Sequence, residues 1–154
     1  FKRNKTASFV DNGQEPSGWP LTFVDYGLGC GVHGLSTTID SGAASVDYVI
    51  VSSYTGIILF NGRYILPELS WKISNLWTGQ TFKTDNRKIQ ILNDSVGQKL
   101  YIVLTDGRVL FGDYSNGLDP KKIRWVPWTF RDEVIVTTIV LFNVNELLVG
   151  TIDS

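Results

Sequence analysis

Short apolar segments that alternate with turn-rich segments are the main feature of this 154-residue sequence. In the middle of the chain, apolar residues fall at alternate positions, as they do in half-buried β-strands. The strands predicted there are residues 87–92, 99–104, 109–111 and 123–130. Thr105-Asp106-Gly107 has the composition of a tight turn. Pro127 has no N–H to donate to a neighbouring strand, so we predict that the last of these strands is an edge strand.

The same order of segments recurs about every fifty residues along the chain. Phe9, Phe60 and Phe111 occupy matching positions, each 51 residues after the one before. A second series matches Tyr48-Val49-Ile50-Val51 with Leu100-Tyr101-Ile102-Val103 and with Leu147-Leu148-Val149. Four short strands in a repeat of this length are typical of a β-propeller blade. We therefore predict an all-β fold of antiparallel four-stranded blades, with about three β-propeller-like repeats of roughly 50 residues in a single region over residues 1–154.

The predicted repeat units are residues 31–78, residues 86–130, and a third unit divided between residues 1–25 and 134–154. A closed propeller normally has roughly four to eight blades, so three blades would form a partial propeller with exposed sheet surfaces. Either the terminal half-blades of several copies join into a homo-oligomeric ring, or a longer chain supplies the remaining blades. The two matching halves favour the oligomer, whereas the absence of Met and the first residue, Phe1, favour the longer chain.

Residues 67–77 fit two structures equally well. Leu69, Ile73, Leu76 and Trp77 have the spacing of one face of a helix. We therefore expect either a short helix or an outer strand in this segment, and almost no helix elsewhere.

Histidine and cysteine each occur once, which limits the chemistry that the chain can support. His33 is followed by Ser36 and Asp40, but no G-x-S-x-G elbow is present. Residues 29–34, which include Cys30, match G-x-G-x-x-G, yet β-type residues follow where a phosphate-binding helix would begin. We expect these glycines to allow close strand packing. We expect no catalytic residues, no bound metal and no organic cofactor.

The acidic residues suggest two further sites. Residues 113–119 place side-chain oxygens at positions one, three and seven, as calcium loops do, but Gly117 and Arg124 replace two of the required ligands. We therefore expect a solvated turn there. Paired carboxylates can support glycoside hydrolysis, although nothing in the sequence brings any two candidates together. These candidates are Asp40, Asp47, Glu68, Asp106, Asp132 and Glu133.

Tryptophan supplies the candidate binding residues. Trp19 and Trp125 recur at the same place in the repeat, so we predict that they pack between blades. Trp71, Trp77 and Trp128 are the candidate contact residues, because an exposed tryptophan can stack on a sugar ring or anchor a protein interface.

Charge and hydropathy exclude two classes of partner. The formal net charge is -1, whereas proteins that bind nucleic acid through its phosphates usually carry a basic surplus. No stretch approaches the roughly 18 consecutive apolar residues that a membrane-spanning helix needs. We therefore expect neither nucleic acid as a main ligand nor insertion into a membrane.

Several segments resemble the propeller repeats of tailed-phage virion proteins. These segments are residues 18–27, 32–35, 57–62, 67–73 and 110–114. Proteins of that kind form nozzle, plug or hub components of the head–tail junction or the tail. The resemblance implies a structural component of a virion that binds other protein subunits. The alternative is a β-propeller that binds carbohydrate or hydrolyses glycosides.

Overall fold

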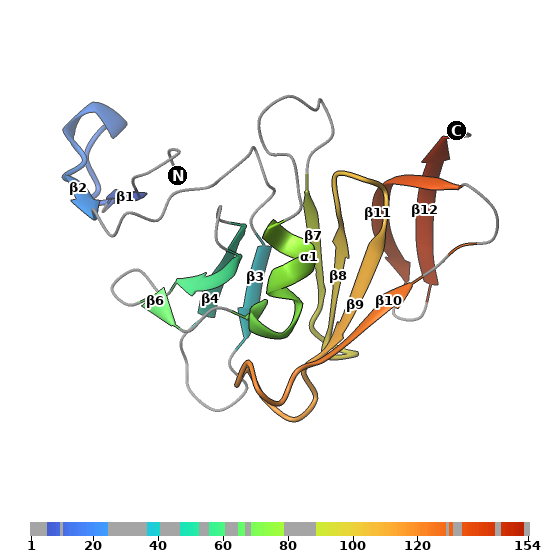
Figure 1. The fold of residues 1–154 in the computed structure, drawn as a ribbon. Coiled ribbons are helices and arrows are strands. Elements are labelled where there is room, and N and C mark those ends of the chain that lie inside the picture. Colours follow the sequence, from blue (N-terminus) through green and yellow to red (C-terminus); the bar gives the residue numbers. More distant parts are fainter. Residues whose placement is uncertain are drawn as a thin grey trace.

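Four antiparallel β-sheets and one short helix make up the described part of the chain (Figure 1). The structure is a computed structural model. It describes residues 6–9, 11–24, 37–40, 47–52, 56–60, 65–66, 69–78, 89–128, 130, 134–143 and 146–152. The predicted all-β class, with antiparallel sheets, is confirmed.

The strands pair with their neighbours in chain order within each sheet. The first sheet has β1 (Thr6–Phe9) and β2 (Leu21–Val24), with the 3-10 turn η1 (Pro16–Gly18) between them. The second has β3 (Thr37–Asp40), β4 (Asp47–Ser52), β5 (Ile57–Phe60) and β6 (Ile65–Leu66). The third has β7 (Gln90–Asp94), β8 (Lys99–Val103), β9 (Val109–Asp113) and β10 (Arg124–Trp128), and the fourth has β11 (Ile135–Asn143) and β12 (Glu146–Ile152).

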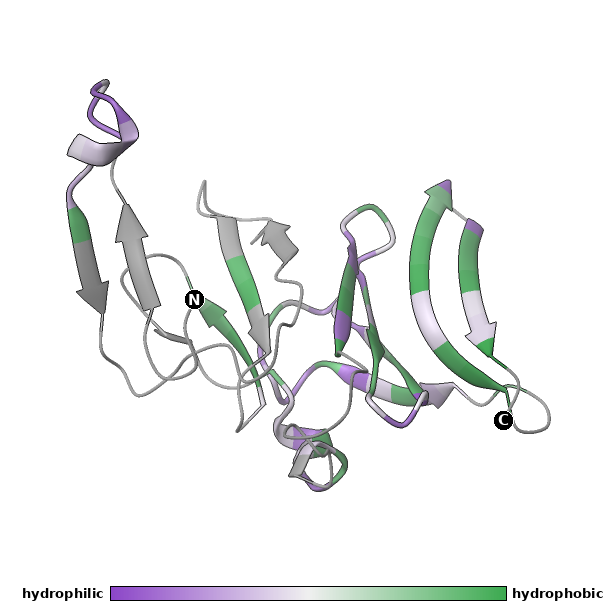
Figure 2. Ribbon diagram, turned by 90° about the horizontal axis from the view of Figure 1, so that it is seen from above, coloured by the Kyte–Doolittle hydropathy of each residue, from purple (hydrophilic) through white to green (hydrophobic). Residues whose placement is uncertain are grey.

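The four sheets follow one another across the molecule without closing into a ring. The β1–β2 hairpin lies at one end and the β11–β12 hairpin at the other (Figures 1 and 2). Between them, the first strands of successive sheets are neighbours, because β7 contacts both β3 and β11. The β7–β10 sheet therefore has one sheet on each of its two faces.

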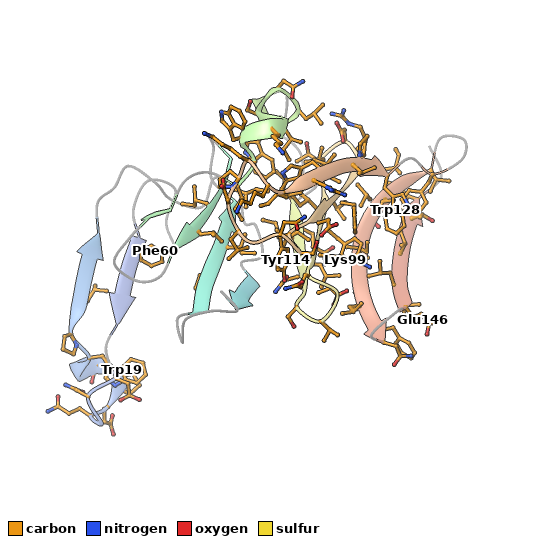
Figure 3. The ribbon with its side chains drawn as sticks, turned by 90° about the horizontal axis from the view of Figure 1, so that it is seen from below. Trp19, Phe60, Lys99, Tyr114, Trp128 and Glu146 are labelled. Atoms are coloured by element: carbon orange, nitrogen blue, oxygen red, sulfur yellow. The ribbon has the colours of Figure 1, made fainter. Side chains whose placement is uncertain are left out.

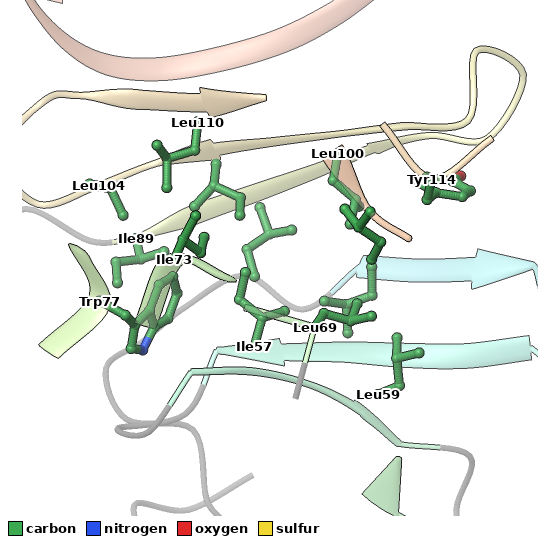
Figure 4. Close-up of a cluster of buried hydrophobic side chains, with 14 residues drawn as sticks. Ile57, Leu59, Leu69, Ile73, Trp77, Ile89, Leu100, Leu104, Leu110 and Tyr114 are labelled. Atoms are coloured by element: carbon green, nitrogen blue, oxygen red, sulfur yellow. The ribbon is translucent and has the colours of Figure 1, made fainter. Parts of the chain in front are cut away.

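The larger hydrophobic core lies between the β3–β6 and β7–β10 sheets (Figure 4). Alternate residues of β8 and the turn after it, Leu100, Ile102 and Leu104, point into this core because strand side chains alternate between faces. Across the core, Ile57 and Leu59 of β5 face them. Each fully buried Leu or Ile side chain contributes roughly 1.5–3 kcal/mol through its removal from water.

A helical segment closes one side of the larger core. It comprises the 3-10 turn η2 (Trp71–Ile73) and helix α1 (Ser74–Thr78), so the helical alternative for this segment is confirmed and the outer strand is not formed. The N–H of Ile57 donates to Ser70 Oγ at 2.9 Å, which joins the segment to β5. Lys72 Nζ donates to the carbonyl of Ile123 at 3.0 Å, which joins it to the start of β10. The segment thus connects the two four-stranded sheets.

A smaller core lies on the other face of the β7–β10 sheet. The intervening β8 residues Tyr101 and Val103, together with Val109 of β9, pack there against Val136 and Ile139 of β11. Four consecutive positions of β8 are therefore buried, two on each face. The sheet is apolar on both sides and needs a covering layer on each.

The turn and edge predictions for the β7–β10 sheet are confirmed. Gly107 has φ of +83° in the turn between β8 and β9, a conformation that glycine adopts without strain. β10 is the outermost strand, and Pro127 lies on it opposite Leu110. Gly112 of β9 leaves room for the neighbouring strand, because a Cβ there would overlap the ring of Trp125.

The two four-stranded sheets share one pairing register at the repeated positions. Val49 of β4 lies opposite Phe60 of β5, and Tyr101 of β8 lies opposite Phe111 of β9. Leu59, which precedes Phe60, and Leu110, which precedes Phe111, both point into the larger core, from opposite sides. The 51-residue match therefore describes strand register, and the matched positions of the two sheets face each other across this core, whereas successive propeller blades would turn them the same way.

One side chain ties the β11–β12 hairpin to the rest of the molecule. Gln90 of β7 accepts hydrogen bonds from Ile139 N and Thr138 Oγ1, both at 2.9 Å, and donates to Ile139 O at 2.8 Å. The glutamine thus takes the place of a strand backbone in pairing with β11. Together with the smaller core and the hydrogen bond from Val136 N to Gly107 O, it holds the hairpin on the β7–β10 sheet.

We predict that Gln90→Ala lowers the free energy of unfolding by about 1–3 kcal/mol, because partly buried backbone groups of β11 lose their partners. Urea denaturation measures this change. Gln14→Ala is the matched control and should change stability by less than about 0.5 kcal/mol, since that side chain hydrogen-bonds only within an exposed turn. Equal effects of the two substitutions would contradict the role of Gln90.

Candidate functional site

Exposed apolar side chains gather on the side of the β7–β10 sheet that carries the smaller core. Val126 lies opposite Phe111 and Trp128 lies opposite Val109, so these β10 side chains share the face that β11 covers further along. Val126, Trp128 and the following Phe130 are all exposed, with 42% of Trp128 accessible. We call these three residues the β10 strip.

Aromatic rings connect the β10 strip to the smaller core. The central ring of this series belongs to Trp128, which is labelled in Figure 3. The ring centroids of Trp128 and Phe130 are 5.6 Å apart, and those of Trp128 and Tyr101 are 6.0 Å apart. Tyr101 in turn lies 5.6 Å from Phe111. Tilted rings at these separations attract one another, so the exposed aromatic residues have a fixed arrangement.

A second apolar surface lies on the side of the β11–β12 hairpin that faces away from the β7–β10 sheet. Val140 and Leu148 lie opposite each other in the hairpin, and both are exposed. Phe142, 63% accessible, and Ile152 extend this surface along the two strands. We call these four residues the outer face; apolar colouring runs along most of both strands (Figure 2).

The two surfaces share one structural cause. One face of the β7–β10 sheet is covered by a four-stranded sheet and a helical segment, which bury Leu110 and partly bury Trp125 on the outer strands. The other face is covered by a hairpin of two strands, which contacts β7 and β8. None of the described strands covers the outer half of that face, which carries the β10 strip.

Charged groups near the β10 strip include Lys99 and Asp113, which are register partners on β8 and β9. Lys99 Nζ lies 6.0 Å from the centroid of the Phe111 ring. Burial raises the pKa of the Tyr101 phenol, and the negative charge of Asp94 raises it further, so Tyr101 is neutral at physiological pH. Asp113 Oδ1 accepts a hydrogen bond from the N–H of Ser115 at 2.9 Å, and this bond lowers the pKa of the Asp113 carboxyl. The chemistry available here is apolar contact and aromatic stacking.

The three predicted contact residues have different positions. Trp128 belongs to the β10 strip, and Trp71 is exposed, with 59% of its surface accessible. The prediction is wrong for Trp77, which is 0% exposed because it fills the larger core. Trp71 and Trp128 do not form one site, since Trp71 belongs to the helical segment beside the larger core, whereas Trp128 lies on the face of the β7–β10 sheet that carries the smaller core.

The two repeat-matched tryptophans also differ. Trp125 packs against the larger core, and its Nε1 donates to the carbonyl of Leu69 at 3.3 Å, so it does lie between two sheets as predicted. Trp19 is partly buried within its own hairpin, where Nε1 donates to the carbonyl of Gln14 at 2.9 Å. Packing of Trp19 between sheets stays a prediction.

The remaining sequence candidates provide no assembled site in the described residues. His33, Cys30 and the rest of the G-x-G-x-x-G match lie outside the described residues, as do Ser36, Glu68, Asp132 and Glu133. Asp106 forms an ion pair with Arg108 in the exposed β8–β9 turn. Asp40 and Asp47 are register partners at one end of β3 and β4, but their side chains are not described.

The predicted solvated turn over residues 113–119 matches the structure. The carboxylates of Asp113 and Asp119 each accept a hydrogen bond from a backbone N–H two residues later. Gly117 has φ of +96°, as turns of this kind require. Among the described residues, no three His, Cys, Asp or Glu side chains are grouped as metal ligands.

Sequence reasoning missed most of the exposed apolar residues. Val126, Phe130, Val140 and Leu148 were recognised as strand residues, but not as surface residues. The available signal was the small number of polar residues at alternate positions of 123–130 and 134–142.

Comparison of the chain with protein-family models, curated proteins and solved structures finds no match. No helix in the described segments is long and apolar enough to cross a membrane.

We predict that Trp77→Ala lowers the free energy of unfolding by about 3–5 kcal/mol, because it leaves a large cavity in the core. Trp71→Ala, the matched control, should change stability by less than about 0.5 kcal/mol, since its side chain is mostly exposed. Thermal or urea denaturation of both variants checks the difference. A strongly destabilised Trp71→Ala variant would show that Trp71 is part of the core.

We predict that the carboxyl of Asp113 titrates below the ordinary Asp pKa of about 4. Because its pKa is lowered in the folded state, the charged carboxylate stabilises the fold at neutral pH. This contribution begins to be lost as the pH falls below about 4, and is fully lost below the folded-state pKa. Carboxyl NMR of the folded chain measures the pKa. In Asp113→Asn, which keeps an acceptor for the Ser115 N–H but does not titrate, acid destabilisation should be smaller; an unchanged acid profile would contradict the assignment.

Proposed function

We propose that this chain is a structural protein that binds other protein subunits in a large assembly of the phage-virion type. The observation that carries the proposal is the pair of apolar surfaces, the β10 strip and the outer face. Contiguous exposed apolar surface in a soluble protein commonly marks an interaction site. Aromatic residues such as Trp128 and Phe130 are the kind that anchor protein interfaces.

The β11–β12 hairpin favours a protein, rather than a small ligand, as the partner. An isolated two-stranded sheet is at best marginally stable in water, and its unpaired edges favour pairing with a further strand. A protein partner can bury the outer face and complete the hydrogen bonding of the sheet edge at once. A small ligand can do neither.

The order of the sheets supports a propeller-like arrangement for such an assembly. Four-stranded antiparallel sheets, paired in chain order and with their first strands adjacent, are what successive propeller blades have. Two four-stranded and two two-stranded sheets contain as many strands as three blades would need, if the two hairpins are counted as the halves of one blade. Further strands are then needed to close a ring, and we infer that other subunits or further blades of a longer chain supply them.

The resemblance to propeller repeats of tailed-phage virion proteins supports the virion as the location. The formal net charge of -1 and the apolar character of the two surfaces fit protein contacts better than contacts with packaged nucleic acid. We propose a place in the tail or the head–tail junction on this basis. Catalysis has no part in the proposal.

A carbohydrate-binding propeller is the second candidate, and the aromatic cluster around Trp128 favours it. The ring centroid of Trp128 lies 6.0 Å from that of Tyr101 and 5.6 Å from that of Phe130, and exposed aromatic rings can stack on sugars. Binding to a glycan array that is lost in Trp128→Ala would establish this alternative. The assembly is preferred because the outer face has no such aromatic cluster and still needs a cover.

We predict that particles produced from the genome that encodes this chain contain it in a fixed ratio to the other particle proteins. Quantitative mass spectrometry of gradient-purified particles measures the ratio. Val140→Asp should be lost from particles, because it places a charge on the outer face, whereas Val96→Asp should be retained, because Val96 is exposed in the β7–β8 turn and belongs to neither surface. Absence of the wild-type chain from particles would defeat the proposal.

A further inference from the structure

Two of the four sheets have half the strands of the other two. The β3–β6 and β7–β10 sheets have four strands each, whereas β1–β2 and β11–β12 have two. Among the described strands, β12 pairs only with β11, and β1 pairs only with β2. Each hairpin therefore has a strand edge that is available for one more partner.

The β11–β12 hairpin corresponds to the first two strands of the β7–β10 sheet. Ile139 lies opposite Val149 in the hairpin, as Ile91 lies opposite Ile102 in the complete sheet. On the other side of the hairpin, Leu148 takes the position of Tyr101 in the repeated series. Tyr101 is buried by the next sheet, whereas Leu148 is exposed. The third strand would add to β12, as β9 adds to β8.

The β1–β2 hairpin corresponds to the last two strands. Two residues after Phe9 and Phe111, Asp11 and Asp113 each accept a hydrogen bond from a backbone N–H two residues later. The connections that follow both contain a glycine with positive φ, 77° at Gly13 and 96° at Gly117. β1 is thus followed by the same local turn structure as β9, the third strand of the complete sheet.

We propose that the β1–β2 hairpin of a second copy completes the sheet that β11–β12 begins, so that β1 of one copy pairs with β12 of the other. The proposal rests on the proposed function, since it names the partner that covers the exposed surfaces. A second copy is required because the two hairpins lie at opposite ends of one chain (Figures 1 and 2). Copies then associate head to tail, a heterologous contact that forms a ring where its rotation closes.

The register of the new strand pair follows from the two complete sheets. Val49 pairs with Phe60 and Tyr101 pairs with Phe111. Leu148 matches Val49 and Tyr101 in one repeated series, and Phe9 matches Phe60 and Phe111 in the other. Leu148 of one copy therefore lies opposite Phe9 of the second copy.

The β10 strip provides a second and independent reason for this placement. In the larger core, the outer strands of the β7–β10 sheet are covered by the outer strands of the neighbouring sheet and by the helical segment. Added strands beside β12 would lie over β9 and β10 in the same way. They would cover Val126 and Trp128, which the two-stranded hairpin leaves exposed.

One charge pair in this register weakens the contact and provides a test. Lys99 lies opposite Asp113 in the complete sheet. In the proposed pair the corresponding residues are Glu146 and Asp11, which have like charges. Glu146→Lys restores the opposite-charge arrangement and should tighten self-association by about threefold, as expected for a cross-strand charge pair.

Disulfide cross-linking tests the pairing and its register. In a Cys30→Ser background, one chain carries Leu148→Cys and a second chain carries Phe9→Cys. Directly opposite residues of antiparallel strands have Cα atoms about 4.5–5.5 Å apart, which a disulfide can bridge. Mild oxidation of the mixture should yield about tenfold more cross-linked dimer than the control mixture of Leu148→Cys with Ser8→Cys, whose cysteines lie on opposite faces of the sheet.

Light scattering on the unmodified chain and on Glu146→Lys gives a readout that does not depend on the cysteine variants. Concentration-dependent association that Glu146→Lys strengthens would support the proposal. A chain that stays monomeric at high concentration, equal cross-linking in both mixtures, or a disulfide that forms only within a chain carrying both cysteines would overturn it. If the chain is nevertheless a component of purified particles, the proposed function stands and only the partner is wrong.

Discussion

The rest of the structure depends on one constraint, which is that the β7–β10 sheet is apolar on both faces. Leu100, Tyr101, Ile102 and Val103 are consecutive and all buried, so alternate side chains of β8 enter two different cores. A sheet of this kind is stable only when both faces are kept from water. The stacking of one sheet on each side, and the order of the sheets across the molecule, follow from that requirement.

The two covers are unequal, and this inequality produces the candidate site. On one side, four strands and the segment from Leu69 to Trp77 bury their half of the sheet almost completely. On the other side, the β11–β12 hairpin buries the inner strands and is joined to β7 by hydrogen bonds with Gln90. The uncovered remainder includes Trp128. The exposed apolar surface thus results from the smaller number of strands on this side. Polar residues at a few of these strand positions would have avoided it.

Local patterns predicted the strands well, because alternation and turn residues act over a few positions. The strand at 99–104, the turn at Gly107 and the edge position of Pro127 are examples. Burial was less predictable, because alternation assigns a side chain to a face without showing what covers that face. Trp77 and Trp128 illustrate this: the core surrounds one, whereas no described strand covers the other. Likewise, the match of Phe60 with Phe111 gave the pairing register, but not that Leu59 and Leu110 enter one core from opposite sides.

The character of the exposed surface bears on what can cover it. Val140, Leu148 and Ile152 are aliphatic, and they lie on a sheet whose edge strand still has backbone groups to pair. A carbohydrate offers hydroxyl groups that would need polar partners, which these side chains lack. A strand from another protein offers both apolar side chains and backbone N–H and C=O groups, so it satisfies the face and the edge together. The unequal covering of one sheet is therefore the structural basis of the proposed association by strand addition, in which the aromatic residues of β10 would lie beneath the added strands.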